Sequence, residues 1–227
     1  MFTGFSAQAL DFFGELRENN NRDWFARNKS RYEGNVLEPA LEFVAALQQP
    51  LHKVSPHFLA VPKKSGGSIM RIYRDTRFSK DKTPYKTNLG IQFRHEAGKD
   101  AHAPGFYFHL DENSIFMGAG IWNPEVAVQK QIRELIDDDQ PRWTRLKNKK
   151  LFRETFEFHG ESLKRPPQGF DNSHPLIEDL RRKDHFIAAP LSRREISTPG
   201  LIDMFINRAK LALPYMRFLC DAIRRPC

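Results

Sequence analysis

The chain has 227 residues, of which 40% are hydrophobic and 12% aromatic, with a formal net charge of +8 and a pI of about 9.6. A chain of this length buries roughly 70% of its unfolded surface, so it can form a core without disulfides or a metal, and its composition excludes a disordered protein. No segment approaches the roughly 18 consecutive apolar residues of a membrane span, and the basic charge favours anionic partners.

The N-terminus and the cysteines predict a reducing compartment. Residues 1–6 lack a basic start followed by an apolar run, so we expect no signal peptide and a cytoplasmic protein. If the last helix ran to the terminus, Cys220 and Cys227 would lie about 10 Å apart, too far for a disulfide. Neither cysteine has the spacing of a zinc site or a redox pair.

The N-terminal part, about residues 6–54, is predicted to be helical. Ser6 and Asn21 are expected to cap the first and second helices, and Gly34 to end the second. Apolar residues at helical spacing continue from residue 37 to residue 51. Pro39 must lie in the first turn of this third helix or kink it.

After a loop over Ser55–Gly67, the apolar period changes from 3.6 to 2, which predicts a sheet over about residues 68–122. The candidate strands are Ser68–Asp75, Asn88–His95, Gly105–Asp111 and Ser114–Trp122. The turn at Asp111-Glu-Asn113 makes the last two strands a hairpin. In the third strand, Phe106, Phe108 and Leu110 would share one face, and Tyr107 and His109 the other.

The remainder, about residues 123–227, is predicted to be helices and a loop. We expect a helix that starts at Asn123-Pro-Glu125 and runs to about Asp138, followed by a polar basic segment over Pro141–Lys150. A loop over Leu163–Pro175, a short helix in Pro175–Lys183 and a strand over His185–Leu191 should come next. The last helix should open at Thr198-Pro199 and kink at Pro214. The order of elements predicts one α+β domain spanning residues 1–227. Its largely antiparallel sheet of about four to six strands would be flanked by N-terminal and C-terminal helices.

The main chemical feature is a group of cations that we call the basic hairpin, residues 71–86. Its candidate ligand-binding residues are Arg71, Tyr73, Arg74, Arg77, Lys80, Lys82 and Lys86. Arginine forks match phosphate or carboxylate oxygens and lysines add point charge, while Tyr73, Phe78 and Tyr85 supply rings between the cations. The alternative is that Asp75 and Asp81 pair with arginines and the rest is a solvated hairpin.

A second candidate site is the strand that carries Gly118 and Gly120 and leads to the predicted helix start at Asn123. Glycines allow a ligand to approach the backbone, and a helix N-terminus attracts an anion. The third glycine of a dinucleotide-binding fingerprint is absent. Close packing against a neighbouring element is the alternative explanation for both glycines.

Candidates for proton transfer are Asp75, Asp81, Tyr85 and His174, because acids among arginines often have shifted pKa values and cluster at functional sites. His174 lies in one loop with Asp171, which allows an acid–base pair. The alternative is a structural loop in which Asp171 accepts from backbone N–H groups.

The eight histidines lack metal-site spacing, and no nucleophile elbow or phosphate-binding loop occurs. We therefore expect neither a metal nor a cofactor.

Residues 71–86, Arg-Ile-Tyr-Arg-Asp-Thr-Arg-Phe-Ser-Lys-Asp-Lys-Thr-Pro-Tyr-Lys, resemble the signature of an uncharacterised, mainly bacterial family, domain of unknown function 2461. Gly105-Phe-Tyr, Gly118-Ala-Gly-Ile-Trp122 and residues 164–175 resemble further landmarks of that family, in the same order. The resemblance implies a single-domain protein of about this length and implies no reaction.

Three functional hypotheses stay open. The basic hairpin could bind a phosphate-bearing partner, with nucleic acid as the most general candidate. The protein could be an enzyme acting on a small anionic substrate clamped by Arg71, Arg74 and Arg77. It could also be a module for an acidic protein. A concave pocket with converging side chains favours the enzyme, whereas a flat or convex basic face favours nucleic acid.

Overall fold

The structure is a computed structural model that describes residues 1–98 and 103–227. In these residues, five strands form one sheet in the order β1-β2-β3-β5-β4. The strands are β1 (Leu89–Arg94), β2 (Gly105–Leu110), β3 (Ile115–Ile121), β4 (Glu157–His159) and β5 (His185–Pro190). All neighbouring strands are antiparallel. The predicted α+β fold with an antiparallel sheet between two groups of helices is confirmed.

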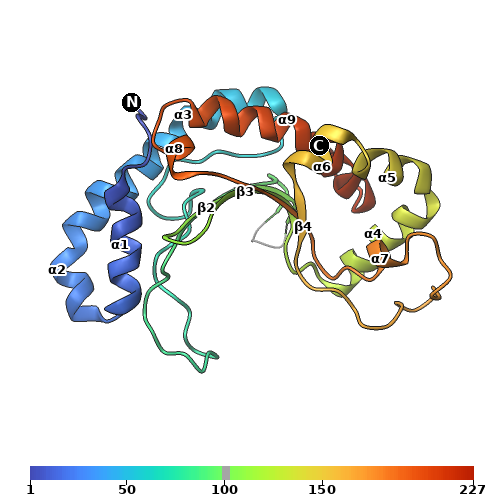
Figure 1. Ribbon diagram of the computed structural model, residues 1–227, viewed down its shortest axis with the longest axis horizontal. Coiled ribbons are helices and arrows are strands. Elements are labelled where there is room, and N and C mark those ends of the chain that lie inside the picture. Colours follow the sequence, from blue (N-terminus) through green and yellow to red (C-terminus); the bar gives the residue numbers. More distant parts are fainter. Residues whose placement is uncertain (99–102) are drawn as a thin grey trace.

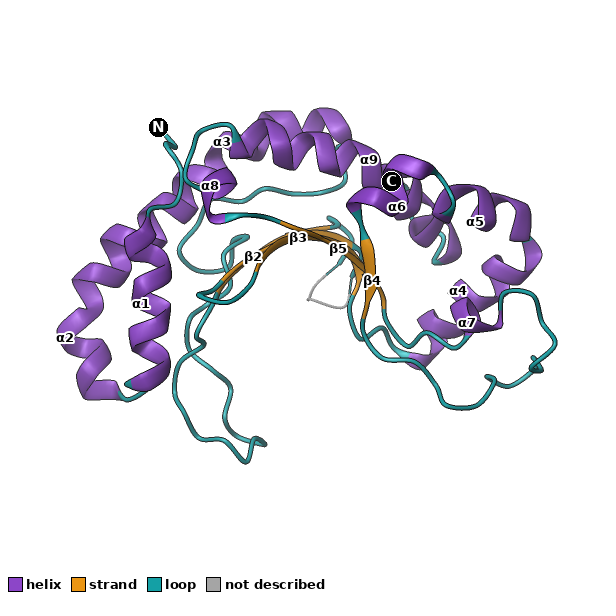
Figure 2. Ribbon diagram, in the orientation of Figure 1, coloured by secondary structure: helices purple, strands orange, loops and turns teal. Residues whose placement is uncertain are grey.

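The sheet is arched, and its helices lie over the convex face and at the two ends (Figure 1). Over the convex face lie α3 (Glu38–Val54) and α9 (Leu201–Ala222). One end holds α1 (Ala7–Glu18) and α2 (Arg22–Tyr32), and the other holds α4 (Val126–Asp138), α5 (Gln140–Lys147), α6 (Lys150–Thr155) and α7 (Ile177–Leu180). Short α8 (Arg193–Ile196) follows β5. No helix in the described residues covers the concave face (Figure 2).

Alternation along the strands decides which residues enter the core. Phe106, Phe108 and Leu110 of β2 are fully buried on the convex side, as predicted. The ring of Phe43 in α3 lies 5.1 Å from that of Phe108 and 5.7 Å from that of Phe205 in α9. Tyr107 and His109 point to the uncovered concave face, so this face is the place to look for a site.

The helices of the N-terminal part lie where the sequence predicts them, except that the second helix does not end at Gly34. Ser6 occupies the N-cap position of α1 without a side-chain hydrogen bond, and Asn21 Oδ1 accepts from the Trp24 N–H at 2.9 Å to cap α2. Pro39 lies in the first turn of α3. Gly34 does not end α2, because a π-helical segment, η1 (Glu33–Leu37), joins α2 to α3 and brings two apolar side chains into the core.

The predicted strand Ser68–Asp75 is wrong. The segment makes only isolated bridges, Ile69 with Ile91 and Tyr73 with Tyr85. An antiparallel ladder that began with the first pair would place Tyr73 opposite Thr87, so the pairing slips by two residues. The slip interrupts the ladder, and the basic hairpin continues beyond the sheet as an irregular projection (Figure 1).

The helix start predicted at Asn123 is also wrong, since α4 begins at Val126 with Glu125 as its N-cap. Asn123 takes a left-handed backbone (φ 48°), and its N–H donates to Asp184 Oδ1 at 2.7 Å. The segment Pro141–Lys150, predicted only as polar and basic, contains all of α5 except its first residue, and Trp143 of this helix is fully buried. The three-residue strand β4 was not predicted, because its pairing with β5 leaves no local pattern.

The last helix does not reach the C-terminus, so the separation expected for the two cysteines is wrong. Pro214 lies inside α9, which ends at Ala222. Arg224 has a φ of 55°, and the Arg225 N–H returns to the Cys220 carbonyl at 2.9 Å. The turn brings the Cys220 and Cys227 thiols into hydrogen-bonding contact, and both are free thiols. Among the described residues, no helix has the length and apolar character needed to cross a membrane.

Candidate functional site

The acids of the basic hairpin pair with its arginines. Arg77 Nη2 lies 2.7 Å from Asp75 Oδ2, and Arg74 bonds Asp81 and Thr83. The hydrogen bond from Arg77 holds the pKa of Asp75 at about 2, and that from Arg74 does the same for Asp81. Both carboxylates are therefore ionised at neutral pH and engaged by arginines, which makes them poor proton-transfer groups.

The three rings of the hairpin lie in different surroundings. Phe78 is 95% and Tyr73 is 53% exposed, whereas Tyr85 is 5% exposed and its ring stacks on Phe25 at 4.1 Å. Burial raises the pKa of Tyr85. Its backbone is held by Asn20, whose side chain donates to the Tyr85 carbonyl at 2.9 Å and accepts from the Tyr85 N–H at 3.0 Å. Tyr85 therefore anchors the base of the hairpin and is unsuited to stack on a ligand.

A cavity of about 370 Å³ lies at this base, and we call it the basic pocket. It is lined by Arg17, Asn20, Arg74, Asp81, Thr83, Tyr85, Lys86, Thr87 and Asn88, and its one acid, Asp81, is the partner of Arg74. Four predicted residues, Arg74, Asp81, Tyr85 and Lys86, thus line one cavity with two residues from the α1–α2 region, Arg17 and Asn20. Arg71 and Tyr73 line a different cavity beside α2, and Lys82 bonds the Thr76 carbonyl at 2.8 Å near the hairpin tip.

Lys86 is the least compensated cation of the basic pocket. Arg17 pairs with Glu112 at 2.8 Å and Arg74 with Asp81, but in the described part of the chain Lys86 has no acidic partner. Burial, and then the neighbouring Arg71, lower the pKa of the Lys86 ammonium. A partly buried ammonium without a carboxylate is costly to desolvate, and an anion in the pocket would remove that cost.

The glycines Gly118 and Gly120 allow close packing within the sheet. A Cβ on Gly118 would meet the Phe186 ring at 2.0 Å, and one on Gly120 would meet the His185 carbonyl oxygen at 2.0 Å. Gly120 also has a φ of 132°, which L side chains rarely adopt. Because Asn123 is not at a helix start, the predicted combination of glycine strand and helix N-terminus is not present.

The loop that carries His174 leads into α7, which lies at the opposite end of the sheet from α1 and α2 (Figure 1). Its Nε2 contacts Asp137 Oδ1 at 2.9 Å, and its Nδ1 accepts from the Leu176 N–H at 3.1 Å. Asp171 accepts from the Ser173 N–H at 2.7 Å, as in the structural-loop alternative. Within residues 1–98 and 103–227, no three His, Cys, Asp or Glu side chains form a group that could hold a metal; His102 lies outside the described residues.

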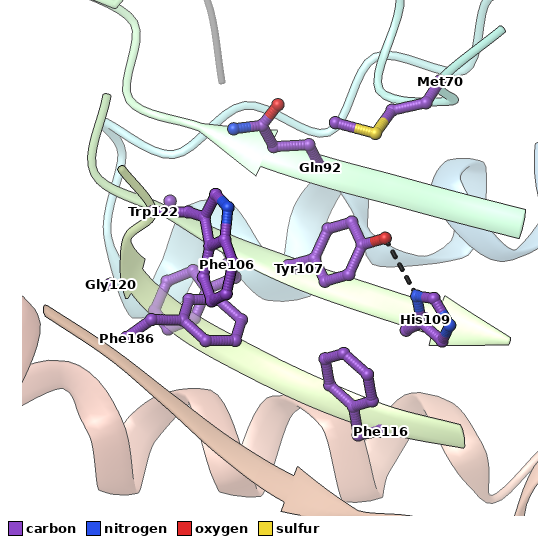
Figure 3. Close-up of a pocket in the computed structure, with 10 residues that line it drawn as sticks. Met70, Gln92, Phe106, Tyr107, His109, Phe116, Gly120, Trp122 and Phe186 are labelled. Atoms are coloured by element: carbon purple, nitrogen blue, oxygen red, sulfur yellow. Dashed lines mark hydrogen bonds between the residues drawn. The ribbon is translucent and has the colours of Figure 1, made fainter. Parts of the chain in front are cut away.

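The concave face carries a second cavity, of about 290 Å³, which we call the aromatic pocket. Gly120, one of the predicted ligand-binding residues, is among its lining residues, which are Met70, Gln92, Gly105, Phe106, Tyr107, His109, Phe116, Gly120, Trp122 and Phe186. In Figure 3, Trp122 and Phe186 stand at one end, His109 and Phe116 at the other, and Tyr107 between them. The indole of Trp122 packs edge-on to Phe186 at 5.6 Å, and the His109 ring stacks on Phe116 at 4.7 Å.

Three side chains at two-residue steps along β2 and its turn form a hydrogen-bonded chain. Tyr107 Oη lies 3.1 Å from His109 Nδ1, and His109 Nε2 lies 3.2 Å from Asp111 Oδ2. The other Asp111 oxygen accepts from the Asn113 and Ser114 N–H groups at 2.7 Å, which fixes the carboxylate. Burial lowers the pKa of His109, and burial with the nearby Asp111 charge raises that of Tyr107 to about 12. The spacing Tyr-x-His-x-Asp on one strand face was the available signal for this group.

The two pockets are adjacent. Asn88 lines the basic pocket, and its side chain hydrogen-bonds Tyr107 of the aromatic pocket. A ligand with a planar group and an anionic group could therefore occupy both.

Comparison with protein families identifies the chain. A family model described as "Conserved hypothetical protein (DUF2461)" matches residues 8–218. The chain belongs to this family. Domain of unknown function 2461 thus covers every strand, both pockets and most of α9. Neither the comparison with curated proteins nor that with solved structures gave a match.

Proposed function

We propose that the protein binds a small organic anion at the concave face of the sheet. A planar part of the ligand lies against the rings of the aromatic pocket, and its phosphate or carboxylate lies in the basic pocket. The observation that carries this proposal is Lys86, a partly buried cation without an acidic partner among the described residues, which lines the same cavity as Arg74. Concave shape and converging side chains support the small-anion alternative among the three hypotheses from the sequence.

The experiment is a thermal-shift screen of nucleoside monophosphates and aryl phosphates, each beside its dephosphorylated counterpart. A compound that binds the native state alone raises the melting temperature in proportion to the logarithm of its concentration. We expect the phosphorylated member of a pair to raise it, and the dephosphorylated member to have little effect.

Two lysine variants provide the matched comparison. Lys86→Met and Lys80→Met remove the same charge, but Lys80 is exposed at the hairpin tip and lies outside the basic pocket. Lys86→Met should weaken binding by about tenfold or more, since a charge-assisted contact contributes roughly 1.5–3 kcal/mol, and Lys80→Met should leave it unchanged. Equal losses in both variants, or no stabilising compound, would exclude the basic pocket as the binding site.

Single-stranded nucleic acid is a second candidate ligand, supported by the exposed part of the basic hairpin. Phe78 is 95% exposed, the Arg77 guanidinium lies 5.8 Å from its ring centre, and Lys80 is exposed nearby. Exposed rings among cations are typical of stacking surfaces for bases. Binding of a labelled oligonucleotide should fall steeply with salt and be lost in Phe78→Ala/Lys80→Ala. Binding of an acidic peptide but not of the oligonucleotide would instead support a protein partner.

The proposal also includes the cellular compartment of the protein. Cys220 and Cys227 are not joined by a disulfide, and a reducing compartment would keep them as thiols. We propose that the protein, and therefore its ligand, is cytoplasmic.

A further inference from the structure

We propose that Tyr107 is a catalytic residue that exchanges a proton with a small anionic substrate in the aromatic pocket, with His109 as the partner that takes up or returns the proton. The class of substrate rests on the proposed function. The hydrogen-bonded chain of Tyr107, His109 and Asp111 is observed in the structure and does not depend on that proposal. The reaction class is general acid–base catalysis, since the aromatic pocket offers no other ionisable side chain.

The direction of the hydrogen bonds follows from Asp111. An ionised carboxylate can only accept, so His109 donates from Nε2 and presents Nδ1 as an acceptor. The Tyr107 hydroxyl must then donate to Nδ1. Loss of the Tyr107 proton to His109 would form an imidazolium, whose charge the Asp111 carboxylate stabilises.

The surroundings hold this arrangement in place. Asp111 is fixed by two backbone N–H groups of its own turn, and the His109 ring is held flat on Phe116. Side-chain exposure is 17% for His109 and 18% for Asp111, so neither is freely solvated. Asp111 is therefore a positioning residue, while Tyr107 and His109 both line the pocket.

The pKa directions place the proton on Tyr107 in the resting state; because both oppose charge separation, the proton moves to His109 only as the Tyr107 oxygen reacts. Burial keeps His109 neutral by lowering its pKa, so Nδ1 is available as a base at neutral pH. Tyr107, with its pKa raised to about 12, stays protonated until a partner removes its proton. The other lining residues named for the pocket, such as Gln92, Phe116 and Trp122, carry no group that titrates near neutral pH.

The test uses benzenesulfonyl fluoride, an electrophile with one planar ring and no phosphate. In its reaction the Tyr107 oxygen forms a bond to sulfur, the sulfur–fluorine bond breaks, fluoride leaves and the phenol proton passes to His109 Nδ1. Mass spectrometry of peptides gives the modification rates of Tyr107 and of the exposed Tyr73 in the same sample, from pH 5 to pH 9.

We expect Tyr107 to react about tenfold or more faster than Tyr73 at neutral pH, because a positioned base contributes at least that much. Its rate should level off once His109 is neutral, above about pH 6.5 at the highest. In His109→Gln the rate should fall and then rise about tenfold per pH unit, as for an unassisted phenol. Asp111→Asn should lower the plateau, and His159→Gln, an exposed histidine on β4, should change nothing.

A tenfold rise of the Tyr107 rate per pH unit in the unaltered protein, or an unchanged rate in His109→Gln, would overturn the proposal. The Tyr73 rate and the circular dichroism spectrum report whether each variant is folded, and Asp111→Asn provides the test if His109→Gln is not. The experiments distinguish failure of the Tyr107 proposal from failure of the anion-binding proposal. Lys86→Met should lose anion binding and keep the fast Tyr107 reaction, whereas His109→Gln should keep anion binding.

Discussion

On the convex face of the sheet, Phe93, Phe106 and Phe108 are fully buried under α3 and α9, whereas on the concave face Tyr107, His109 and Phe116 stay partly exposed. The strand β2 supplies residues to both sets, because successive side chains alternate between faces. Burial of the convex rings drives folding. The concave residues bury less area and keep polar groups in a cavity, so this face is free to serve a ligand.

Two histidines, His109 and His185, show the same difference between the concave face and the core. His109 on the concave side has a hydrogen-bond partner for each ring nitrogen. His185 on β5 is fully buried, and neither of its ring nitrogens has a hydrogen-bond partner among the described residues. One histidine is arranged for proton transfer, and the other is held neutral within the core.

The largest effect should come from truncating matched rings on the two faces. Phe108→Ala should lower the free energy of unfolding by ~3–5 kcal/mol, since it leaves a cavity between Phe5 and Phe43. Phe116→Ala should cost less than about half of that, because Phe116 is already partly exposed. Urea titration measures both, and equal losses would contradict the division between the faces.

His185 should make stability depend on pH. Burial first, and then Arg133 and Arg182, lower its pKa to about 3. Since this folded value lies below the unfolded value of about 6.5, the folded state binds fewer protons, and its stability is fully present above pH 6.5. Stability should fall by up to ~1.4 kcal/mol per pH unit as the pH drops toward the folded value.

Urea titrations between pH 4 and pH 7 measure this slope. His185→Leu should flatten it, whereas His52→Leu, a substitution at an exposed histidine, should leave it intact. A slope that survives His185→Leu would assign the effect to other groups.

A smaller effect is expected where the basic hairpin joins the α1–α2 region. Asn20→Ala removes both hydrogen bonds to the Tyr85 backbone and should lower the free energy of unfolding by ~1–2 kcal/mol. It should also weaken anion binding, because Asn20 lines the basic pocket. Asn19→Ala, which loses one exposed bond to Glu15, is the control for stability. Full retention of binding in Asn20→Ala would show that the base of the hairpin need not be held by this side chain.

The smallest effect concerns the cysteines and should leave stability nearly unchanged. The hydrogen bond from Cys220 lowers the pKa of Cys227, and the same bond, followed by burial, raises that of Cys220. Because the thiolate is the reactive form, native protein should react with iodoacetamide at Cys227 first. Cys220→Ser should preserve this reaction or slow it, and Cys227→Ser should abolish the fast phase. Equal rates at the two positions would contradict the contact between the two thiols.

The outcome at particular residues shows what local pattern can predict. The alternation in β2 correctly assigned Phe106, Phe108 and Leu110 to the core, because strand geometry imposes that period. The cap at Asn21 was predicted correctly because capping is local chemistry, whereas Ser6 holds the N-cap position without a side-chain hydrogen bond. The strand expected over Ser68–Asp75 failed, since pairing depends on partners elsewhere in the chain, and here the register slips.

The sequence by itself determined the α+β class, the order of the main elements and the family, because each depends on short-range periodicity or on consecutive residues. It also located two cations of the basic pocket, Arg74 and Lys86. Tertiary structure decided which residues join them: Arg17 and Asn20 come from a distant helix pair, and the aromatic pocket combines residues of separate strands. Such neighbours leave no local trace, because they are brought together only when the arched sheet packs its convex face and leaves the other uncovered.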